Sequence, residues 1–146
     1  MKRQAFTLVE LVVVILILGI LAGVAAPRFL DTAETANEAS LRQSLSVVRD
    51  AIELYAAQNG GFVPMQAGSS SESSDLPTEL ADYLRGGLPV CPVGARNNEV
   101  RTVGTAVTPS GAATPLDGWL YNRTNGDFVC NFNGATSDPL VTYDQL

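Results

Sequence analysis

The stretch FTLVELVVVILILGILAGVAAP, residues 6–27, decides the fold. From Leu11 to Ala26 every residue is apolar or glycine, and Glu10 is the single charge in the whole stretch. A helix over residues 6–26 would be about 32 Å long at 1.5 Å per residue, close to the roughly 30 Å of hydrocarbon in a bilayer. Length and composition together predict a membrane-spanning helix.

Two basic residues, Lys2 and Arg3, are the only charges that precede Glu10. Basic residues beside a membrane segment hold that end of the chain in the cytoplasm. We therefore expect a single-pass protein of a bacterial inner membrane, with a cytoplasmic N-terminus and a periplasmic remainder.

Three interpretations of the apolar stretch differ in where the chain is cut. A secretory signal would be cut after the small residues 24–26, but Pro27 would then follow the cut directly, and Glu10 would lie in a normally uncharged stretch. An ordinary membrane anchor would not explain the presence of Glu10. A prepilin signal is cut before the apolar run, which the mature protein then retains.

The sequence KRQA-FTLVEL resembles the N-terminus of type IV pilins and type II secretion pseudopilins, which share FTLVEL after a short basic leader. The resemblance is specific from Lys2 to about Tyr55 and favours the third interpretation. It implies that a prepilin peptidase cuts between Ala5 and Phe6, and that Phe6 becomes the N-methylated first residue. The family usually has glycine before the cut, and Ala5 departs from that pattern while remaining small.

The resemblance also assigns assembly roles to Glu10 and Pro27. A carboxylate at the centre of a membrane helix costs about 2.5–3.5 kcal/mol, and an ammonium partner lowers that cost. The resemblance implies that Glu10 pairs with the amine of Phe6 in a neighbouring subunit as a filament grows. The alternative is a carboxylate that only extends to the membrane interface. Pro27 lacks a backbone donor, which predicts a kink or a locally melted turn.

Residues 28–59 change to an amphipathic pattern with apolar spacings of three and four, which predicts one helical face. Gly60-Gly61 predicts the helix end. The simplest interpretation is one helix from Phe6 to about Asn59, about 80 Å long. Glu38 and Arg42 would form an i, i+4 pair on it. The apolar face comprises Leu30, Ala33, Asn37, Leu41, Leu45, Val48, Ile52 and Tyr55, and the opposite face Glu34, Glu38, Arg42, Arg49 and Glu53.

The remainder predicts a small loop-rich head. We expect a loop over residues 62–76, a short helix over 77–85 because proline suits the first turn, and a strand over 99–107. With the long helix, these elements predict an α+β fold in which the helix packs on a small antiparallel sheet. The resemblance implies the same architecture, the pilin-like lollipop.

Residues 118–132 give the clearest hairpin signal. Asn125-Gly126 favours a two-residue type I′ turn, which would pair Tyr121 with Cys130 and Trp119 with Phe132. Alternation then puts five residues on the core face of the sheet. These are Trp119, Tyr121, Phe128, Cys130 and Phe132.

The chain has two cysteines, Cys91 and Cys130. In the oxidising periplasm we expect them to form a disulfide, since Cys130 would point inward within reach of Cys91. A bond that closes a loop of about 39 residues contributes about 4 kcal/mol in the loop-entropy account.

Composition argues against catalysis and against nucleic-acid binding. There is no histidine, the commonest general base, and paired cysteines would remove the usual nucleophile. A net charge of −6 disfavours nucleic acid. No cofactor is required, although Asp117, Asp127 and Asp138, with Asp144, offer the hard oxygen ligands that calcium prefers. Some G-type pseudopilins hold calcium in a C-terminal loop; the alternative here is solvated turn carboxylates.

We therefore predict a structural subunit, not an enzyme, trimmed before Phe6 and polymerised with its apolar helices in the filament core, where they avoid water. Its parts are a leader (1–5), an apolar helix (6–26), an amphipathic helix (27–60) and a head (61–146). The resemblance implies that its partners are further copies, other pseudopilins or pilins, the prepilin peptidase, an ATPase and an inner-membrane assembly platform.

The short loop-rich head favours a type II secretion pseudopilus. The first alternative is a type IV pilus subunit for adhesion, motility or DNA uptake. An alternative of another class is a membrane-anchored periplasmic binding module, which would be a monomer with a ligand pocket.

Overall fold

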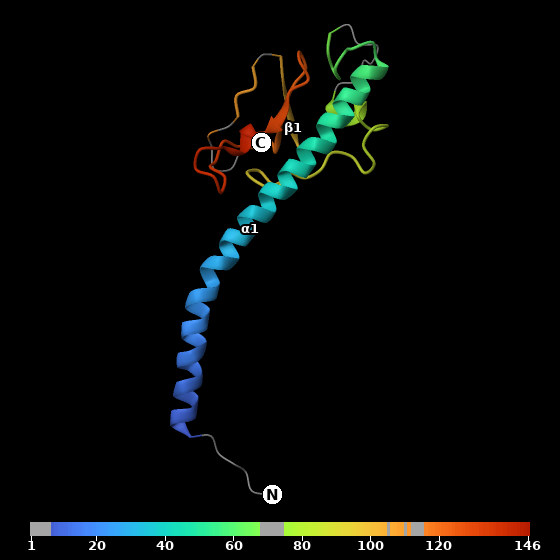
Figure 1. Cartoon of the computed structure of the whole chain (residues 1–146). Helices are drawn as coiled ribbons and strands as arrows, with labels where there is room; N and C mark the ends of the chain where they lie inside the picture. Colours follow the sequence, from blue (N-terminus) through green and yellow to red (C-terminus); the bar gives the residue numbers. More distant parts are fainter. Residues whose placement is uncertain (1–6, 68–74, 105, 110, 112–115) are drawn as a thin grey trace, which may run out of the picture. The chain divides into compact units, whose positions relative to one another are not determined.

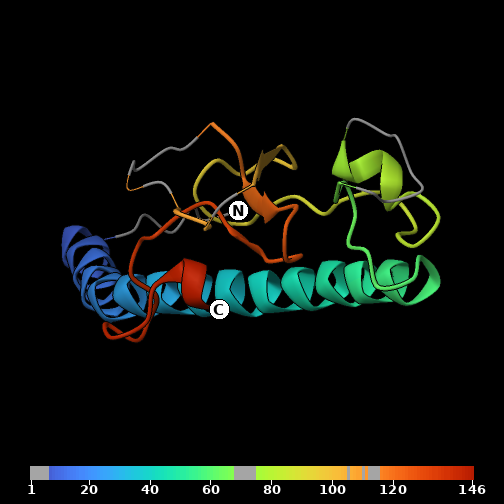
Figure 2. The same cartoon turned by 90° about the horizontal axis from the view of Figure 1, so that it is seen from above.

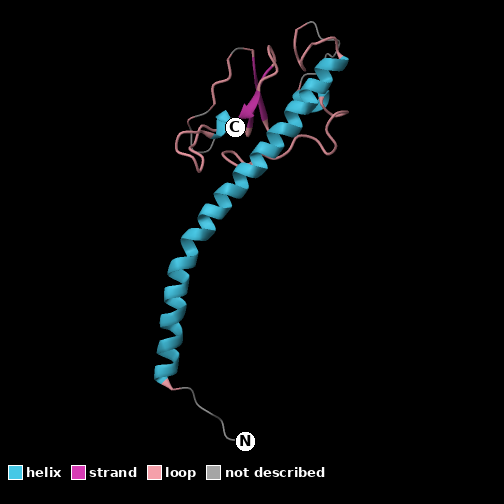
Figure 3. Cartoon of the chain, viewed as in Figure 1, coloured by secondary structure: helices cyan, strands magenta, loops and turns pink. Residues whose placement is uncertain are grey.

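A computed structural model describes residues 7–67, 75–104, 106–109, 111 and 116–146. The predicted leader, its cut between Ala5 and Phe6, and the serine-rich part of the 62–76 loop lie outside the described residues. The elements run in the order α1 (Leu8–Gln58), α2 (Leu76–Glu79), β1 (Val100–Val103), β2 (Trp119–Asn122), β3 (Phe128–Cys130) and the 3-10 helix η1 (Tyr143–Gln145), as Figures 1 and 3 show. The predicted α+β class is confirmed.

The long helix α1 is continuous, as predicted. It passes through Pro27 without a break, so the turn there is not melted. It ends where the double glycine was expected to end it: Gly60 and Gly61 have φ of 67° and 91°, and the Gly61 N–H donates to the Ala56 carbonyl at 2.8 Å. Such a left-handed cap satisfies carbonyls of the last helical turn.

The chain divides into two compact units, residues 1–35 and 36–146, and α1 contributes to both. In the first unit, the window Leu8–Ala25 has a mean hydropathy of 2.9, and none of it is buried. By length and composition this part of α1 suffices to cross a membrane.

In the second unit, α1 contributes one stripe to the hydrophobic core. Leu41, Leu45, Val48, Ile52 and Tyr55 are all buried, which confirms five of the eight positions predicted for the apolar face. Ala33 is exposed and Asn37 half-buried, while the side chain of Leu30 lies outside the described part. Figure 2 shows the strands and the intervening loops lying over one side of this part of α1.

The sheet is mixed rather than antiparallel, which corrects the prediction. β2 pairs antiparallel with β3, but β1 pairs parallel with β2, with Val100 opposite Trp119. The connection over residues 104–118 is long enough to return the chain to the start of the sheet, which parallel pairing requires. β1 is also shorter than predicted, since it ends at Val103. The helix expected over 77–85 is likewise short, since α2 ends at Glu79, although Leu80 and Leu84 beyond it are buried.

The hairpin loop begins two residues earlier than predicted, so that Trp119 lies opposite Cys130 and Tyr121 opposite Phe128. The cause is Asn122, whose Oδ1 accepts the Thr124 N–H and whose carbonyl accepts the Gly126 N–H, both at 2.9 Å. These bonds make a four-residue loop in which Gly126 has φ of 83°. Because a shift of two preserves the faces, the predicted core residues remain inward, with Phe132 half-buried.

Candidate functional site

The described chain starts with a hydrogen-bonded cap on α1. The Thr7 N–H and hydroxyl both donate to Glu10 Oε2 at 2.8 Å, and the Glu10 N–H donates to Thr7 Oγ1 at 3.2 Å. This reciprocal arrangement is a capping box, which satisfies backbone donors at a helix start. This box was not predicted above, although the T-x-x-E spacing of residues 7–10 is its signature.

The capping box leaves half of the Glu10 carboxylate available. Both Thr7 bonds end on Oε2, and Oε1 has no hydrogen-bond partner among the described residues. Neutral donors also leave the negative charge uncompensated. The structure does not describe Phe6, so the pairing of Glu10 with a neighbour's amine stays a prediction, as does the assembly role of Pro27.

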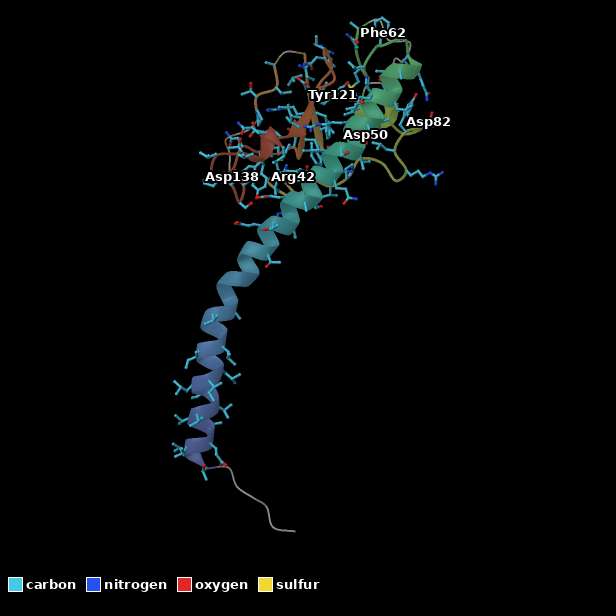
Figure 4. The ribbon with its side chains drawn as sticks, in the orientation of Figure 1. Arg42, Asp50, Phe62, Asp82, Tyr121 and Asp138 are labelled. Atoms are coloured by element: carbon cyan, nitrogen blue, oxygen red, sulfur yellow. The ribbon has the colours of Figure 1, made fainter. Side chains whose placement is uncertain are left out.

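The first half of α1 is apolar on every side. From Leu11 to Leu21 its large apolar side chains are between 46% and 62% exposed, and Figure 4 shows them projecting all round the helix. A helix of this kind is normally surrounded by lipid or protein. Gly19 lines a shallow groove of about 470 Å³ with Val12 and Ile15, and a Cβ on Gly19 would meet nothing in this chain. The groove suits close approach by another helix.

Two charged side chains that were predicted to lie opposite the apolar face of α1 form hydrogen bonds with the head. Glu38 is only 8% exposed and accepts bonds from the Ser137 N–H and, at 2.9 Å, the Ser137 hydroxyl. Arg49 donates from Nε to the Phe128 carbonyl at 3.0 Å and from Nη1 to the Leu146 carbonyl at 3.3 Å. Glu38 therefore does not pair with Arg42, which is exposed. The head covers a wider sector of the helix than the apolar stripe indicates.

Cys91 and Cys130 meet in the core of the head. Their sulfur atoms are 3.4 Å apart, both residues are fully buried, and both are free thiols. Their contact is as predicted, whereas the covalent bond stays a prediction. The hydrogen bond between the thiols lowers the pKa of Cys91 and, together with burial, raises that of Cys130. Gly118 is required here, because a Cβ at that position would lie 2.9 Å from the Cys91 Cβ.

Buried aromatic side chains of β2 anchor the loops of the head. The Tyr121 hydroxyl donates to the Pro64 carbonyl at 2.7 Å, and Trp119 Nε1 donates to the Pro89 carbonyl at 2.8 Å. Burial, and then the nearby Glu79 carboxylate, raise the pKa of Tyr121, so its hydroxyl stays a neutral donor. Each ring thus fills the core and fixes a loop.

The three aspartates considered for calcium do not come together. In the part of the chain that the structure describes, no three histidine, cysteine or acidic side chains are grouped to hold a metal. Asp127 Oδ2 accepts from Asn125 Nδ2 at 2.5 Å, and Asp138 Oδ1 accepts the Leu140 N–H at 3.0 Å. The backbone carbonyl of Asp117 accepts a bond from Asn131 Nδ2 at 3.2 Å. Asp127 and Asp138 thus stabilise their own turns.

Known proteins resemble this chain over part of its length. Residues 1–26 match the family described as "Prokaryotic N-terminal methylation motif". The type IV narrow pilus major component PilA5 of Thermus thermophilus is 37% identical over 81 residues, 51% of this chain and 70% of that protein. The type II secretion system core protein G of Escherichia coli is 30% identical over 99 residues, which cover 64% of this chain and 68% of that protein. The core protein G of Klebsiella pneumoniae is 31% identical over 100 residues, which cover 64% of this chain and 71% of that protein. No solved structure matches significantly.

Proposed function

Because this chain belongs to the family of type IV pilins and type II secretion pseudopilins, we propose that it polymerises through the apolar half of α1 into a type II secretion pseudopilus. It is a structural subunit, as its relatives are components of a pilus and of secretion systems. The proposal includes removal of residues 1–5 by a prepilin peptidase, N-methylation of Phe6, and insertion in the inner membrane with the head in the periplasm.

The observation that carries this proposal is the all-round apolar surface of the window Leu8–Ala25, none of which is buried within the chain. Burial of apolar surface is worth about 25 cal/mol per Å², so this surface must stay out of water. Lipid covers it before assembly. In a filament, the same segments of neighbouring copies would replace the lipid.

Glu10 would set the register in which neighbouring helices align in the filament. Within one chain its Oε2 caps the helix through Thr7, and Oε1 is left to meet an ammonium group. Removal of the leader would create such a group at Phe6. Within an apolar core, an uncompensated carboxylate and an uncompensated ammonium are both costly, so the register that pairs them is strongly preferred.

The pilus alternative is supported by one specific observation, the similarity to a narrow pilus component. Deleting the gene and measuring protein secretion, surface fibres and twitching distinguishes the two functions. A pseudopilus subunit predicts loss of protein secretion with surface fibres and twitching unchanged. Loss of fibres or twitching with normal secretion would instead establish the pilus function, and unchanged secretion, fibres and twitching would contradict both.

A further inference from the structure

The turn over residues 136–141 presents an exposed leucine on a fixed support. Leu140 is 89% exposed, yet its N–H bonds to Asp138 Oδ1, and the Val141 N–H bonds to the Asp138 carbonyl, both at 3.0 Å. The Thr136 N–H bonds to the Val141 carbonyl at 3.1 Å, which closes the turn. The two bonds from Ser137 to Glu38 tie the turn to α1. An apolar side chain held out in water on a fixed turn is preorganised for a partner.

A groove of about 570 Å³ lies along another flank of α1. Its lining includes Val47 of α1, which is 48% exposed, together with Tyr83, Arg85 and Pro89. All of these residues belong to the second unit, residues 36–146. The groove therefore has a mixed lining, in which apolar side chains lie beside Ser40, Gln43 and Ser44 and one exposed positive charge is present.

The turn and the groove lie on opposite flanks of the helix. Glu38, which holds the turn, and Val47, which lines the groove, are nine residues apart, or about two and a half turns of helix. Their side chains therefore point in opposite directions. Figure 4 agrees, since Asp138 of the turn and Asp82, beside the groove, are labelled on either side of α1.

We propose that Leu140 of one copy inserts into the Val47–Tyr83–Pro89 groove of the next copy, an interface that rests on the filament function proposed above. The two surfaces cannot meet within one chain, but between copies they form a head-to-tail contact, which repeats without closing in a filament. The contact also brings Asp138 toward Arg85, an attraction that matters between chains of net charge −6.

Cysteine cross-linking in the native host tests this contact. Full-length chains that carry both Val47→Cys and Leu140→Cys, assembled and mildly oxidised, should run as a ladder of covalent oligomers without reductant. The matched control replaces Leu140→Cys with Leu116→Cys, since Leu116 is equally exposed at 89%. The control and the unmodified chain, whose own cysteines are buried, should give no ladder. Filaments without a Val47–Leu140 ladder, or with an equal ladder in the control, would overturn the docking contact alone.

A second measurement covers the case in which the double variant does not assemble. Leu140→Ser should lower the amount of sheared filament about tenfold, the equivalent of one leucine side chain lost from an interface. Leu116→Ser should leave it unchanged. Equal amounts from both variants would overturn the docking contact, whereas the absence of any filament from the unmodified chain would overturn the proposed function itself.

Discussion

The two halves of α1 place the same residue type in opposite surroundings. Leu16 in the first half is 61% exposed, whereas Leu45 in the second half is 1% exposed. The second half is amphipathic, so a single head can cover its apolar stripe. The first half is apolar all round, so only a surrounding medium can cover it. The second half therefore folds against its own chain, whereas the first half requires lipid or further copies.

The largest effect should come from Glu10, the one charge in the window Leu8–Ala25. Glu10→Ala should reduce filament assembly by more than 100-fold, because loss of one partner from a buried ion pair costs about 3–5 kcal/mol. Sheared-filament immunoblots measure this loss. Glu34→Ala, which changes an exposed glutamate of the same helix, is the control and should assemble normally. Normal assembly of the Glu10 variant would contradict the pairing of Glu10 with a neighbour's amine.

The next effect concerns the stability of the head, which packs on the second half of α1. If Cys91 and Cys130 form a disulfide in the periplasm, its reduction should lower the free energy of unfolding of the head by about 4 kcal/mol, since the bond closes a loop of 39 residues. Denaturant unfolding of the full chain in detergent, with and without reductant, measures the change. Thiol labelling that finds both cysteines free in unfolded protein taken from the periplasm would contradict the bond.

A matched pair of leucines tests the comparison itself. Leu45→Ala should destabilise the head by about 2–5 kcal/mol, because it opens a cavity in a packed core. Leu16→Ala should change the same unfolding free energy by less than about 0.5 kcal/mol, since its side chain contributes nothing to that core. Equal losses from both variants, measured by denaturant unfolding in detergent, would mean that the two halves are not independent.

A matched pair of arginines gives the smallest effect. Arg49→Met removes the bonds to the Phe128 and Leu146 carbonyls, so the head should lose about 1–3 kcal/mol. Arg42→Met should stay within about 0.5 kcal/mol, because Arg42 is exposed. The same unfolding experiment compares them, and a costlier change at Arg42 than at Arg49 would show that the head is held differently.

The features that the sequence predicted well are those with a strong local period. Uniform apolarity marked the first half of α1, a spacing of three and four residues marked Leu41, Leu45 and Val48, and Gly60-Gly61 marked the helix end. Alternation in the hairpin also identified the inward residues, and it survived the error in register because the error was two residues. Each of these signals depends only on residues that are close together in the sequence.

The features that the sequence did not reveal depend on partners far along the chain. Nothing near Glu38 or Arg49 indicates that Ser137 and Leu146 will bond to them, so both were predicted only to lie opposite the apolar face. The parallel pairing of β1 depends on the path of residues 104–118. The turn at Asn125-Gly126 was misjudged because the side chain of Asn122 competes for the backbone donors of the loop.

The most direct test is mass spectrometry of the N-terminus of the protein isolated from cells. Our account predicts a mature chain that starts at N-methylated Phe6 and keeps the whole apolar half of α1. A chain that starts at Pro27 would contradict the account, because the surface that is proposed to join the copies would then be absent.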